Sequence, residues 1–526
     1  MVSVVRLSDM SRQIEINEQF RQALYVMEHT PRSIFITGRA GTGKSTLLNL
    51  FCETTTKKVV VLAPTGVAAL NVKGRTIHSF FGFRPNITVD MIKRQRTREG
   101  KESIYKKLNT IIIDEISMVR ADLLDCVDRF LMLNGPDENK PFGGIQMVFI
   151  GDLYQLPPVI SSREKEIFKT VYESPYFYNA KVFGEMQVDF IELDKVYRQQ
   201  DADFISLLNA IRNRSIDNIG LAAINRRCRP EFLPKDDDHY VYLTTTNLLA
   251  ESINTSRLAN LNKESKQFTA QIEGQFDKEY LPTKVELELK EGAQVMMLNN
   301  DIEGRWVNGS IGEIASIGRK KDGDEYLIID LSDGNVVTVA PYTWEIYNYQ
   351  VEQGILCSEI IGTFTQFPVM LSWAVTIHKS QGKTFDRVII DFGKGTFAHG
   401  QAYVALSRCT SLDGIVLTRP LRLKDILMDF DVVHFLARFQ YHKAEISHPL
   451  TDKMVIIKEA IGRRSALEIV YLKPNDEKSR RVIRPIELGE MQFKNKQYIG
   501  VRAFCLTRNE FRTFRVDRIL EIKEME

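Results

Sequence analysis

Short apolar runs alternate with longer amphipathic stretches along the first part of the chain. Four of these runs, rich in Ile and Val, are SIFIT at 33–37, VVVLA at 59–63, TIIID at 110–114 and MVFIG at 147–151. Apolar runs of this length, separated by helical stretches, are typical of strands buried in a parallel sheet. The pattern therefore predicts an α/β core over residues 1–200.

The same alternation returns after residue 200. The later apolar runs are YVYLTTT at 240–246, RVIIDFG at 387–393 and GIVLT at 414–418. They predict a second α/β core, built from residues 201–262 and 351–440.

Between these two segments the pattern changes to short strands separated by Gly and Asp turns. The strand-like stretches are VELELKEGAQVMML at 285–298, GSIGEIASIG at 309–318 and EYLIIDLSDGNVVTVAP at 325–341. An Asp-Gly pair between two apolar runs is a strong signal for a hairpin. We therefore predict a small β-barrel over residues 263–350, inserted in the second core.

The last part of the chain has a strand pattern of its own. Residues 441–452 are polar and contain Pro449, which predicts a linker. Three strand-like runs follow it, LEIVYL at 467–472, VIRPIEL at 482–488 and QYIGVRAFCL at 497–506. They predict a separate, mostly-β domain over residues 453–526.

Composition favours a cytoplasmic protein. The chain has 526 residues, 44% hydrophobic and 26% charged, which is typical of a soluble protein with several domains. We find neither an apolar run of about 18 residues, as a membrane helix needs, nor an export signal at the start. The six cysteines form no CxxC pair, which argues against a disulfide framework or a zinc site, so we expect buried thiols.

Positive charge is concentrated near the C-terminus. Residues 453–526 hold 17 Lys and Arg against 11 Asp and Glu, a net of +6, whereas the rest of the chain has a net of −4. A second cluster, residues 93–107, has seven basic and two acidic side chains. Such a cluster is either a solvated surface or a contact for nucleic acid.

One motif predicts a nucleotide site. GRAGTGKS, residues 38–45, matches the pattern GxxxxGK[ST] and directly follows the predicted strand at 33–37. In such a loop the backbone amides surround phosphate oxygens, Lys44 neutralises the β- and γ-phosphates of ATP, and the Ser45 hydroxyl binds Mg²⁺. The residues expected to hold the nucleotide are Gly38, Gly41, Thr42, Gly43, Lys44, Ser45 and Thr46.

Two adjacent carboxylates complete the predicted site for hydrolysis. Asp114 and Glu115 follow three isoleucines at the end of a predicted strand. In that position Asp114 can hold the magnesium shell, while Glu115 can orient or deprotonate the attacking water. The two motifs together predict an NTPase.

Five further segments carry a more specific resemblance. They are residues 63–81 (APTGVAALNVKGRTIHSFF), 151–159 (GDLYQLPPV), 193–199 (LDKVYRQ), 373–388 (WAVTIHKSQGKTFDRV) and 400–417 (GQAYVALSRCTSLDGIVL). In this order they resemble the motifs of the Pif-family DNA helicases, a 5′ to 3′ branch of superfamily one related to RecD. The resemblance implies two RecA-like cores that move along single-stranded DNA.

The resemblance also assigns roles near the nucleotide. Gln155 corresponds to the sensor of the γ-phosphate, and Arg198 and Arg408 correspond to arginines that reach this phosphate across the cleft. Gln19, in EINEQF, resembles the residue that reads adenine. The alternatives are structural ion pairs for the two arginines and an exposed helix position for Gln19.

The DNA-binding residues implied by the resemblance come from both cores. They are Thr65, His78, Phe80, Thr376, His378 and Lys379. Hydroxyls and Lys can bind phosphates, whereas His and Phe offer faces for unstacked bases. The two histidines could instead be packed structural residues. His399 departs from the small residue or Pro expected before GQAYVALSR.

Two insertions also correspond to family elements. The basic stretch at 83–105 lies where the family inserts its 1B wedge, and the predicted barrel at 263–350 resembles its 2B domain. For the basic stretch, this position favours a contact with DNA over a solvated surface.

The C-terminal domain resembles a WYL domain, which has a Sm-like barrel and binds nucleic acid or nucleotide ligands. Such domains are named after a Trp-Tyr-Leu triplet, and this chain has IVYL at that place, so the Trp is missing. The arginines expected to bind phosphate include Arg481, Arg484, Arg512 and Arg515. A basic but merely structural cap is the alternative.

The sequence thus predicts an ATP- and Mg²⁺-dependent DNA helicase, monomeric in solution. Its partners are single-stranded DNA and tailed or forked duplexes. A non-unwinding, DNA-activated ATPase that regulates a repair or defence complex remains the main alternative. The helicase part of a RecD-type nuclease complex or of a conjugative relaxase is a third possibility, although no relaxase array of Tyr and His is visible.

Overall fold

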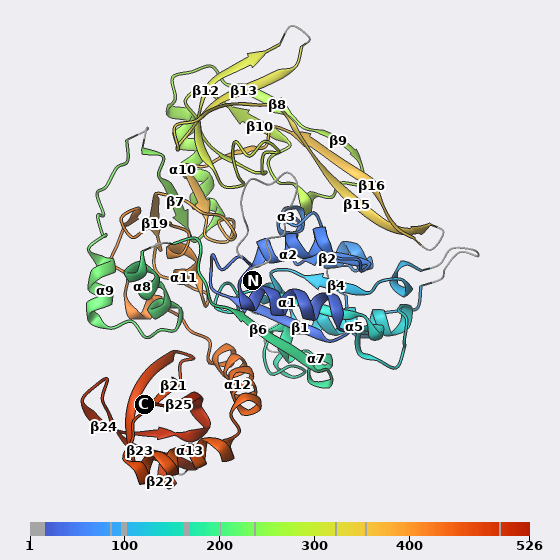
Figure 1. The fold of residues 1–526 in the computed structure, drawn as a ribbon. Helices are drawn as coiled ribbons and strands as arrows, with labels where there is room; N and C mark the ends of the chain where they lie inside the picture. Colours follow the sequence, from blue (N-terminus) through green and yellow to red (C-terminus); the bar gives the residue numbers. More distant parts are fainter. Residues whose placement is uncertain are drawn as a thin grey trace. The chain divides into compact units, whose positions relative to one another are not determined.

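The structure is a computed structural model, and it describes most of the chain. The described residues are 16–84, 87–95, 103–160, 168–199, 201–235, 238–320, 323–352, 355–493 and 496–525. The chain divides into two compact units (Figure 1). The large unit comprises Met1–Ile205 and Ala223–Asp425, and the C-terminal unit comprises Ser206–Ala222 and Ile426–Glu526.

The first core of the large unit is built on a six-stranded parallel sheet with the order β3-β2-β4-β5-β1-β6. The strands are β1 (Ser33–Gly38), β2 (Val59–Ala63), β3 (Arg75–Thr76), β4 (Thr110–Ile113), β5 (Gln146–Ile150) and β6 (Val188–Leu193). Four of them coincide with the predicted apolar runs, which confirms the prediction of a parallel α/β core.

Helices α1 (Glu18–His29) and α2 (Lys44–Thr54) pack against this sheet. Phe20 of α1 and Phe51 of α2 share a fully buried apolar cluster with Ile34 of β1. Asn17 caps α1 by accepting a hydrogen bond from the Phe20 amide at 2.9 Å. The cluster fixes both helices beside the loop that joins β1 to α2.

The second core has a four-stranded parallel sheet with the order β18-β7-β19-β20. Its strands are β7 (Val241–Thr244), β18 (Ala374–Thr376), β19 (Val388–Asp391) and β20 (Ile415–Leu417), and its helices include α10 (Asn247–Asn260) and α11 (Gln401–Leu406). Three of the strands lie inside the predicted runs, so a second α/β core is present.

The insertion between β7 and β18 is made of β-structure, as predicted, but the barrel is not found. In the part of the chain that the structure describes, its strands form three open sheets, β14-β13-β12-β11-β17, β10-β8 and β15-β16-β9. The strands are β8 (Lys266–Thr269), β9 (Gln271–Gly274), β10 (Glu286–Leu289), β11 (Gln294–Met297), β12 (Ile311–Arg319), β13 (Glu325–Leu331), β14 (Val336–Val339), β15 (Tyr342–Glu352), β16 (Ile355–Gln366) and β17 (Val369–Leu371).

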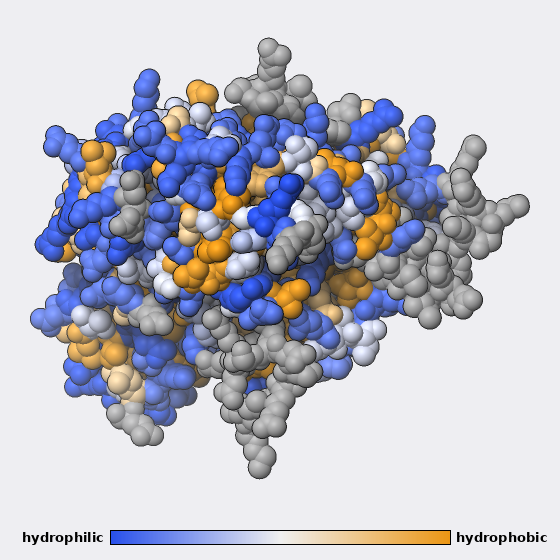
Figure 2. Space-filling view, turned by 90° about the horizontal axis from the view of Figure 1, so that it is seen from above, coloured by the Kyte–Doolittle hydropathy of each residue, from blue (hydrophilic) through white to orange (hydrophobic). Residues whose placement is uncertain are grey.

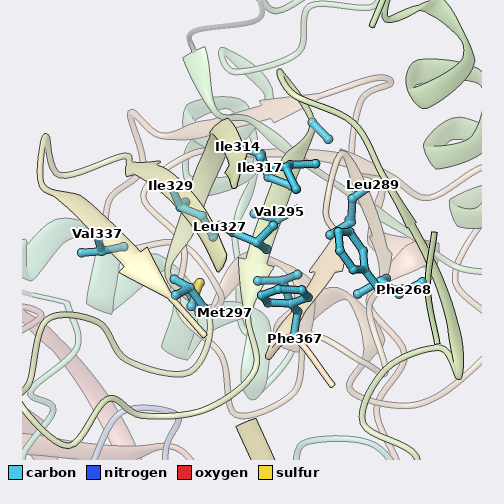
Figure 3. Packing of buried hydrophobic residues seen from close by; sticks show 14 of the residues in the cluster. Phe268, Leu289, Val295, Met297, Ile314, Ile317, Leu327, Ile329, Val337 and Phe367 are labelled. Atoms are coloured by element: carbon cyan, nitrogen blue, oxygen red, sulfur yellow. The ribbon is translucent and has the colours of Figure 1, made fainter. Parts of the chain in front are cut away.

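The insertion is also longer than predicted. Strands β16 and β17 were expected in the second core because they follow residue 350, yet they pair with β15, β9 and β11. The second core therefore resumes only at β18. The inserted sheets enclose a core of their own, in which Phe268, Leu289, Val295, Ile314 and Phe367 are buried (Figure 3).

The C-terminal unit contains a five-stranded antiparallel sheet with the order β24-β23-β22-β21-β25. Its strands are β21 (Leu467–Leu472), β22 (Lys478–Phe493), β23 (Lys496–Cys505), β24 (Glu510–Arg515) and β25 (Ile519–Glu524). The mostly-β prediction is correct. In the described residues this sheet is open, so the Sm-like barrel is not confirmed.

The predicted linker at 441–452 is mostly helical. Helix α12 (Phe430–Ser447) covers its first part, and α13 (Leu450–Arg463) begins directly after Pro449. Pro is compatible with a helix start because the first amides lack partners inside the helix. Ile457 of α13 is fully buried in the core of the C-terminal sheet, so α13 belongs to that domain.

Residues 206–222 belong to the C-terminal unit, although we expected them in the second core. They include the end of α8 (Ala202–Arg212) and the start of α9 (Asn218–Asn225). Asn475, in the turn between β21 and β22, donates a hydrogen bond from Nδ2 to the Asn213 carbonyl at 3.1 Å.

On the face shown in Figure 2, hydrophilic side chains cover most of the surface and hydrophobic ones form small groups. Within the described residues, no helix has the length and apolar character needed to cross a membrane. The thiols of Cys126, Cys409 and Cys505 are buried, as expected, whereas Cys52 is exposed, and all four are free.

Candidate nucleotide and DNA sites

The loop between β1 and α2 has the form of a phosphate-binding loop. Gly43 adopts a left-handed conformation (φ 85°) at the N-cap of α2 and supplies no side-chain cap. The amides of the first turn are therefore available to an anion. Gly38 and Thr42 are buried, whereas Ser45 and Thr46 are exposed at the start of α2.

Gly41 brings a second motif against this loop. It has a φ of 78°, and a Cβ atom at this position would lie 2.5 Å from Cβ of Arg198. The Tyr197 amide donates a hydrogen bond to the Gly41 carbonyl at 2.8 Å. A glycine is therefore required here both by the backbone conformation and by the close approach of residues 197–198.

Lys44 lies over the same loop. Its Nζ donates hydrogen bonds to the carbonyls of Gly38 at 2.7 Å and Arg39 at 2.9 Å. Burial lowers the pKa of Lys44, while the charges of Asp152, Glu115 and Asp114 oppose this effect. The ammonium is thus surrounded by acceptors at the place where phosphate oxygens would bind.

Asp114 and Glu115 lie at the carboxyl end of β4. The Glu115 amide donates to Asp114 Oδ1 at 2.9 Å, and Glu115 itself adopts a left-handed conformation with a φ of 50°. Burial raises the pKa of Asp114, and burial together with the Asp114 charge raises the pKa of Glu115 to about 7. A non-Gly residue in this conformation is strained, and such strain is common at functional sites.

The residues present fit a magnesium ion. Mg²⁺ prefers oxygen ligands and is held in NTPases by one or two protein groups plus substrate phosphates and water. Ser45 and Asp114 supply such oxygens. Among the described residues there is no group of three or more His, Cys, Asp or Glu side chains that could hold a metal, so a dedicated all-protein metal cage is not found there.

Gln381 of the second core contacts both Glu115 and the predicted phosphate sensor Gln155 of the first core. Its Nε2 donates to Glu115 Oε2 at 3.2 Å and to Gln155 Oε1 at 3.2 Å. Gln155 Nε2 in turn donates to Asp152 Oδ2 at 3.3 Å. Gln381 and Asp152 lie in the segments 373–388 and 151–159, which resemble family motifs, but the sequence assigns a role to neither residue.

Residues of the segment 399–403 make further contacts between the cores. Tyr403 OH accepts a hydrogen bond from the Ala40 amide of the phosphate-binding loop at 3.0 Å. His399 Nε2 lies 3.1 Å from the Leu153 carbonyl oxygen, which can only accept, so this nitrogen carries the proton. His399, which stands where the family resemblance implies a small residue or Pro, therefore adds a contact with the segment that carries Gln155.

The two predicted arginines lie near the site but bond to the second core. Arg198 donates to the carbonyls of Ser407 and Gly382, both at 3.3 Å. Arg408 is fully buried, and its Nε donates to the Val404 carbonyl at 2.9 Å. Burial and the charge of Arg198 lower the pKa of Arg408 to about 9. Their role at the γ-phosphate stays a prediction.

Gln19 is half-buried on α1 and donates a hydrogen bond from Nε2 to Asp194 Oδ2 at 3.3 Å. This contact links α1 to the segment that carries Arg198. Adenine recognition by Gln19 stays a prediction, as does the alternative of a helix residue at the surface.

The first-core DNA candidates have unequal access to solvent. Thr65 is exposed and caps α3 (Gly66–Asn71) by accepting from the Ala68 amide at 3.3 Å. His78 is half-buried on α4 (Ile77–Phe81). Phe80 is only 5% exposed, and its ring packs edge-on against Tyr105, so its faces are covered in this conformation. Residues 85–86 and 96–102 of the predicted wedge lie outside the described residues.

The second-core candidates follow β18. Thr376 is buried and accepts a hydrogen bond from the Lys379 amide at 3.2 Å. His378 is half-buried and Lys379 is exposed. The structure therefore brings Lys379 to the surface, whereas the Thr376 hydroxyl serves the local turn.

The four C-terminal arginines do not form one free cationic surface. Arg481 is 7% exposed, so its selection as a surface phosphate ligand is wrong; it lies on the inward-facing side of β22. Arg512 pairs with Glu510, and Arg515 pairs with Asp517. Arg484 is exposed on the outer face, where its strand neighbour Phe504 packs against Phe511.

Comparison with known proteins agrees with this geometry. Residues 12–219 match the model of the PIF1-like helicase family, and residues 452–524 match the WYL domain. The ATP-dependent DNA helicase Pif1 of Bdellovibrio bacteriovorus is 30% identical over 447 residues, covering 81% of this chain and 93% of the relative. The chain belongs to the PIF1-like helicase family.

Solved structures of PIF1-like helicases extend the similarity. The crystal structure of Bacteroides Pif1 with ADP-AlF4 has a TM-score of 0.73 and 35% identity, covering 81% of this chain and 97% of that one. Bacteroides Pif1 bound to single-stranded DNA has a TM-score of 0.58 and 34% identity, covering 80% and 96%. Most of the PIF1-like match, residues 12–205, lies in the large unit, whereas residues 206–219 and the WYL match lie in the C-terminal unit.

Proposed function

We propose that this protein is an ATP-dependent DNA helicase that moves 5′ to 3′ along single-stranded DNA and unwinds tailed or forked duplexes. The observation that carries this proposal is the contact of Gln381 with both Glu115 and Gln155. It joins the water-activating carboxylate and the phosphate sensor of one core to the other core. A change at the γ-phosphate can therefore alter the contact between the cores.

The side chains divide the work of hydrolysis as follows. Lys44 leaves the Gly38 and Arg39 carbonyls for the β- and γ-phosphates, and Ser45 and Asp114 hold Mg²⁺, which supplies charge neutralisation. Glu115 orients the attacking water and accepts its proton. Arg198 and Arg408 stabilise the charge that spreads over the γ-phosphoryl group once they turn from their carbonyl partners. When the γ-phosphate is cleaved, Gln155 moves and alters its hydrogen bond with Gln381 of the second core.

DNA recognition is proposed for both cores and for the WYL domain. Thr65 and Lys379 are the exposed candidates in the cores, and Arg484 is exposed in the WYL domain. Similar structures support this assignment, since one is of Bacteroides Pif1 bound to single-stranded DNA and another concerns the unwinding of forked double-stranded DNA by two coordinating Pif1 helicases. The monomeric state expected from the sequence stays a prediction.

The test compares ATP hydrolysis with and without a saturating single-stranded oligonucleotide. We expect slow turnover without DNA and strong stimulation with it, because DNA favours the arrangement in which both cores reach the nucleotide. Gln381→Ala should retain ATP binding and lose most of the stimulation. Gln267→Ala, on an exposed strand of the insertion, is the matched control. An ATPase rate that DNA leaves unchanged in the parent protein would contradict the proposal.

A further inference from the structure

Phe397 is a large aromatic side chain at the surface of the second core, and no function described above uses it. Its side chain is 64% exposed. Its ring lies nearly parallel to that of His378, with an interplanar angle of 16° and 6.3 Å between the ring centroids. One ring therefore supports the other, while much of Phe397 faces solvent.

The loop that carries Phe397 is held in place on both sides. The Phe397 amide donates to Gln401 Oε1 at 3.0 Å, and Gln401 is fully buried. Thr396 Oγ1 donates to the Asp425 carbonyl at 2.6 Å, and Asp425 pairs with Arg419. An exposed aromatic ring on such an ordered loop loses little conformational entropy when it binds a ligand.

The surroundings of the ring pair fit an unpaired nucleobase. Burial lowers the pKa of His378, so its imidazole is neutral at neutral pH and offers an aromatic face. The next residue, Lys379, is exposed and can bind a backbone phosphate. Aromatic rings beside a cationic side chain form the usual arrangement for single-stranded nucleic acid, in which bases stack and phosphates are neutralised.

We propose that Phe397, backed by His378, is a stacking platform for one base of single-stranded DNA. This inference rests on the proposed function and adds a specific subsite to it. The platform is sequence-tolerant because every base has a π-face. The partner is thus an unpaired nucleotide, and the free face of Phe397 is where its base lies.

The same loop continues to the nucleotide side of the molecule. His399, two residues after Phe397, contacts the Leu153 carbonyl, and Gly400 leaves no room for a Cβ atom beside the Tyr154 and Gln155 carbonyls. A base stacked on Phe397 would therefore lie on the same loop as His399, which contacts the segment that carries Gln155.

Stacking is tested by comparing two ligands that share a backbone. One is an oligonucleotide of about eight thymidines, and the other has the same length with an abasic site at every position. Phe397→Ala in the full-length protein should weaken binding of the thymidine oligonucleotide roughly 5- to 100-fold, the effect of losing one base–aromatic contact. Binding of the abasic oligonucleotide should stay at the parent affinity, and Phe397→Tyr should restore the thymidine affinity.

Two further variants keep the result interpretable. Phe397→Leu keeps an apolar side chain but no ring, so it should behave like Phe397→Ala. Tyr25→Ala removes another aromatic ring of similar exposure, 60%, and should bind as the parent does. Parent-like thymidine affinity of Phe397→Ala, or equal weakening for both ligands, would overturn the platform alone. A parent protein that binds neither ligand would overturn the proposed function as well.

Discussion

At the scale of single residues, the chemistry of the nucleotide site depends on Glu115. Its backbone has a strained left-handed conformation, and burial together with the Asp114 charge raises its pKa to about 7. Glu115→Gln should keep ATP binding but lower turnover by about 10²-fold or more, since a general base typically contributes 10² to 10⁴. Lys44→Ala should lose ATP binding instead. ATP affinity and single-turnover hydrolysis, measured in saturating single-stranded DNA, separate the two effects.

The control for this pair is Asp413→Asn, which removes a carboxylate that is 95% exposed. It should hydrolyse ATP at the parent rate. Parent-like turnover in Glu115→Gln would instead show that another group activates the water.

Lys383 allows a prediction about pH. It is 8% exposed, donates to Asn308 Oδ1 at 2.6 Å, and has a pKa that burial lowers to about 8. Between pH 8 and the pKa of an unfolded Lys, the folded protein binds fewer protons than the unfolded chain, so stability rises with pH. Above pH 8, the free energy of unfolding of the parent protein should rise relative to that of Lys383→Met by up to about 1.4 kcal/mol per pH unit.

Thermal unfolding of both proteins between pH 7 and pH 9.5 measures this difference. A midpoint difference that stays constant across the range would mean that Lys383 keeps its ordinary pKa in the folded state.

Residue identity alone could locate part of the site. Lys44, Asp114 and Glu115 were found because a complete loop motif and a buried strand precede them in the chain. Phe80 comes from a motif that resembles a family DNA-binding motif, and Arg481 comes from an arginine-rich stretch. Both are buried in the structure, and burial depends on contacts that are distant in sequence. Gln381 lies in the motif at 373–388, yet only the structure places it beside Glu115.

At the scale of elements, apolar runs predicted four of the six strands of the first parallel sheet and three of the four strands of the second, because such strands are buried on both faces. The pattern could not decide whether the inserted strands close into a barrel, since alternation describes one strand and not its neighbours. It also missed α13, whose polar first turn follows a proline. A proline there marks a helix start as well as a loop.

The outer face of the WYL sheet gives a prediction at this scale. Arg484 and Arg502 are exposed there and flank Phe504. Changing both arginines to Gln should weaken binding of single-stranded DNA and reduce its salt slope by about one for each lost phosphate contact. The ATPase rate without DNA should not change, because the nucleotide residues lie in the large unit.

Arg463→Gln is the matched control, because Arg463 is exposed on α13 but pairs with Glu459 and Glu524. Affinity titrations at several salt concentrations give the slopes. Equal affinity and slope in the double variant and the parent would favour a structural or ligand-sensing role for the WYL domain.

At the scale of the whole molecule, the sequence predicted two α/β cores, an insertion and a C-terminal domain. Their limits were less accurate, because long-range pairing decides them. Strands β16 and β17 joined the insertion, and residues 206–222 joined the C-terminal unit through contacts such as Asn475 with Asn213. In the proposed function, contacts between the two cores couple ATP hydrolysis to movement on DNA.

Strand displacement tests this claim most directly. A duplex with a 5′ single-stranded tail and the same duplex with a 3′ tail are each incubated with protein, ATP and Mg²⁺. We expect release of the strand only from the 5′-tailed duplex, and no release with Glu115→Gln. Release from the 3′-tailed duplex would contradict the direction of movement, and DNA-stimulated ATP hydrolysis without release from either duplex would contradict the claim that this protein is a helicase.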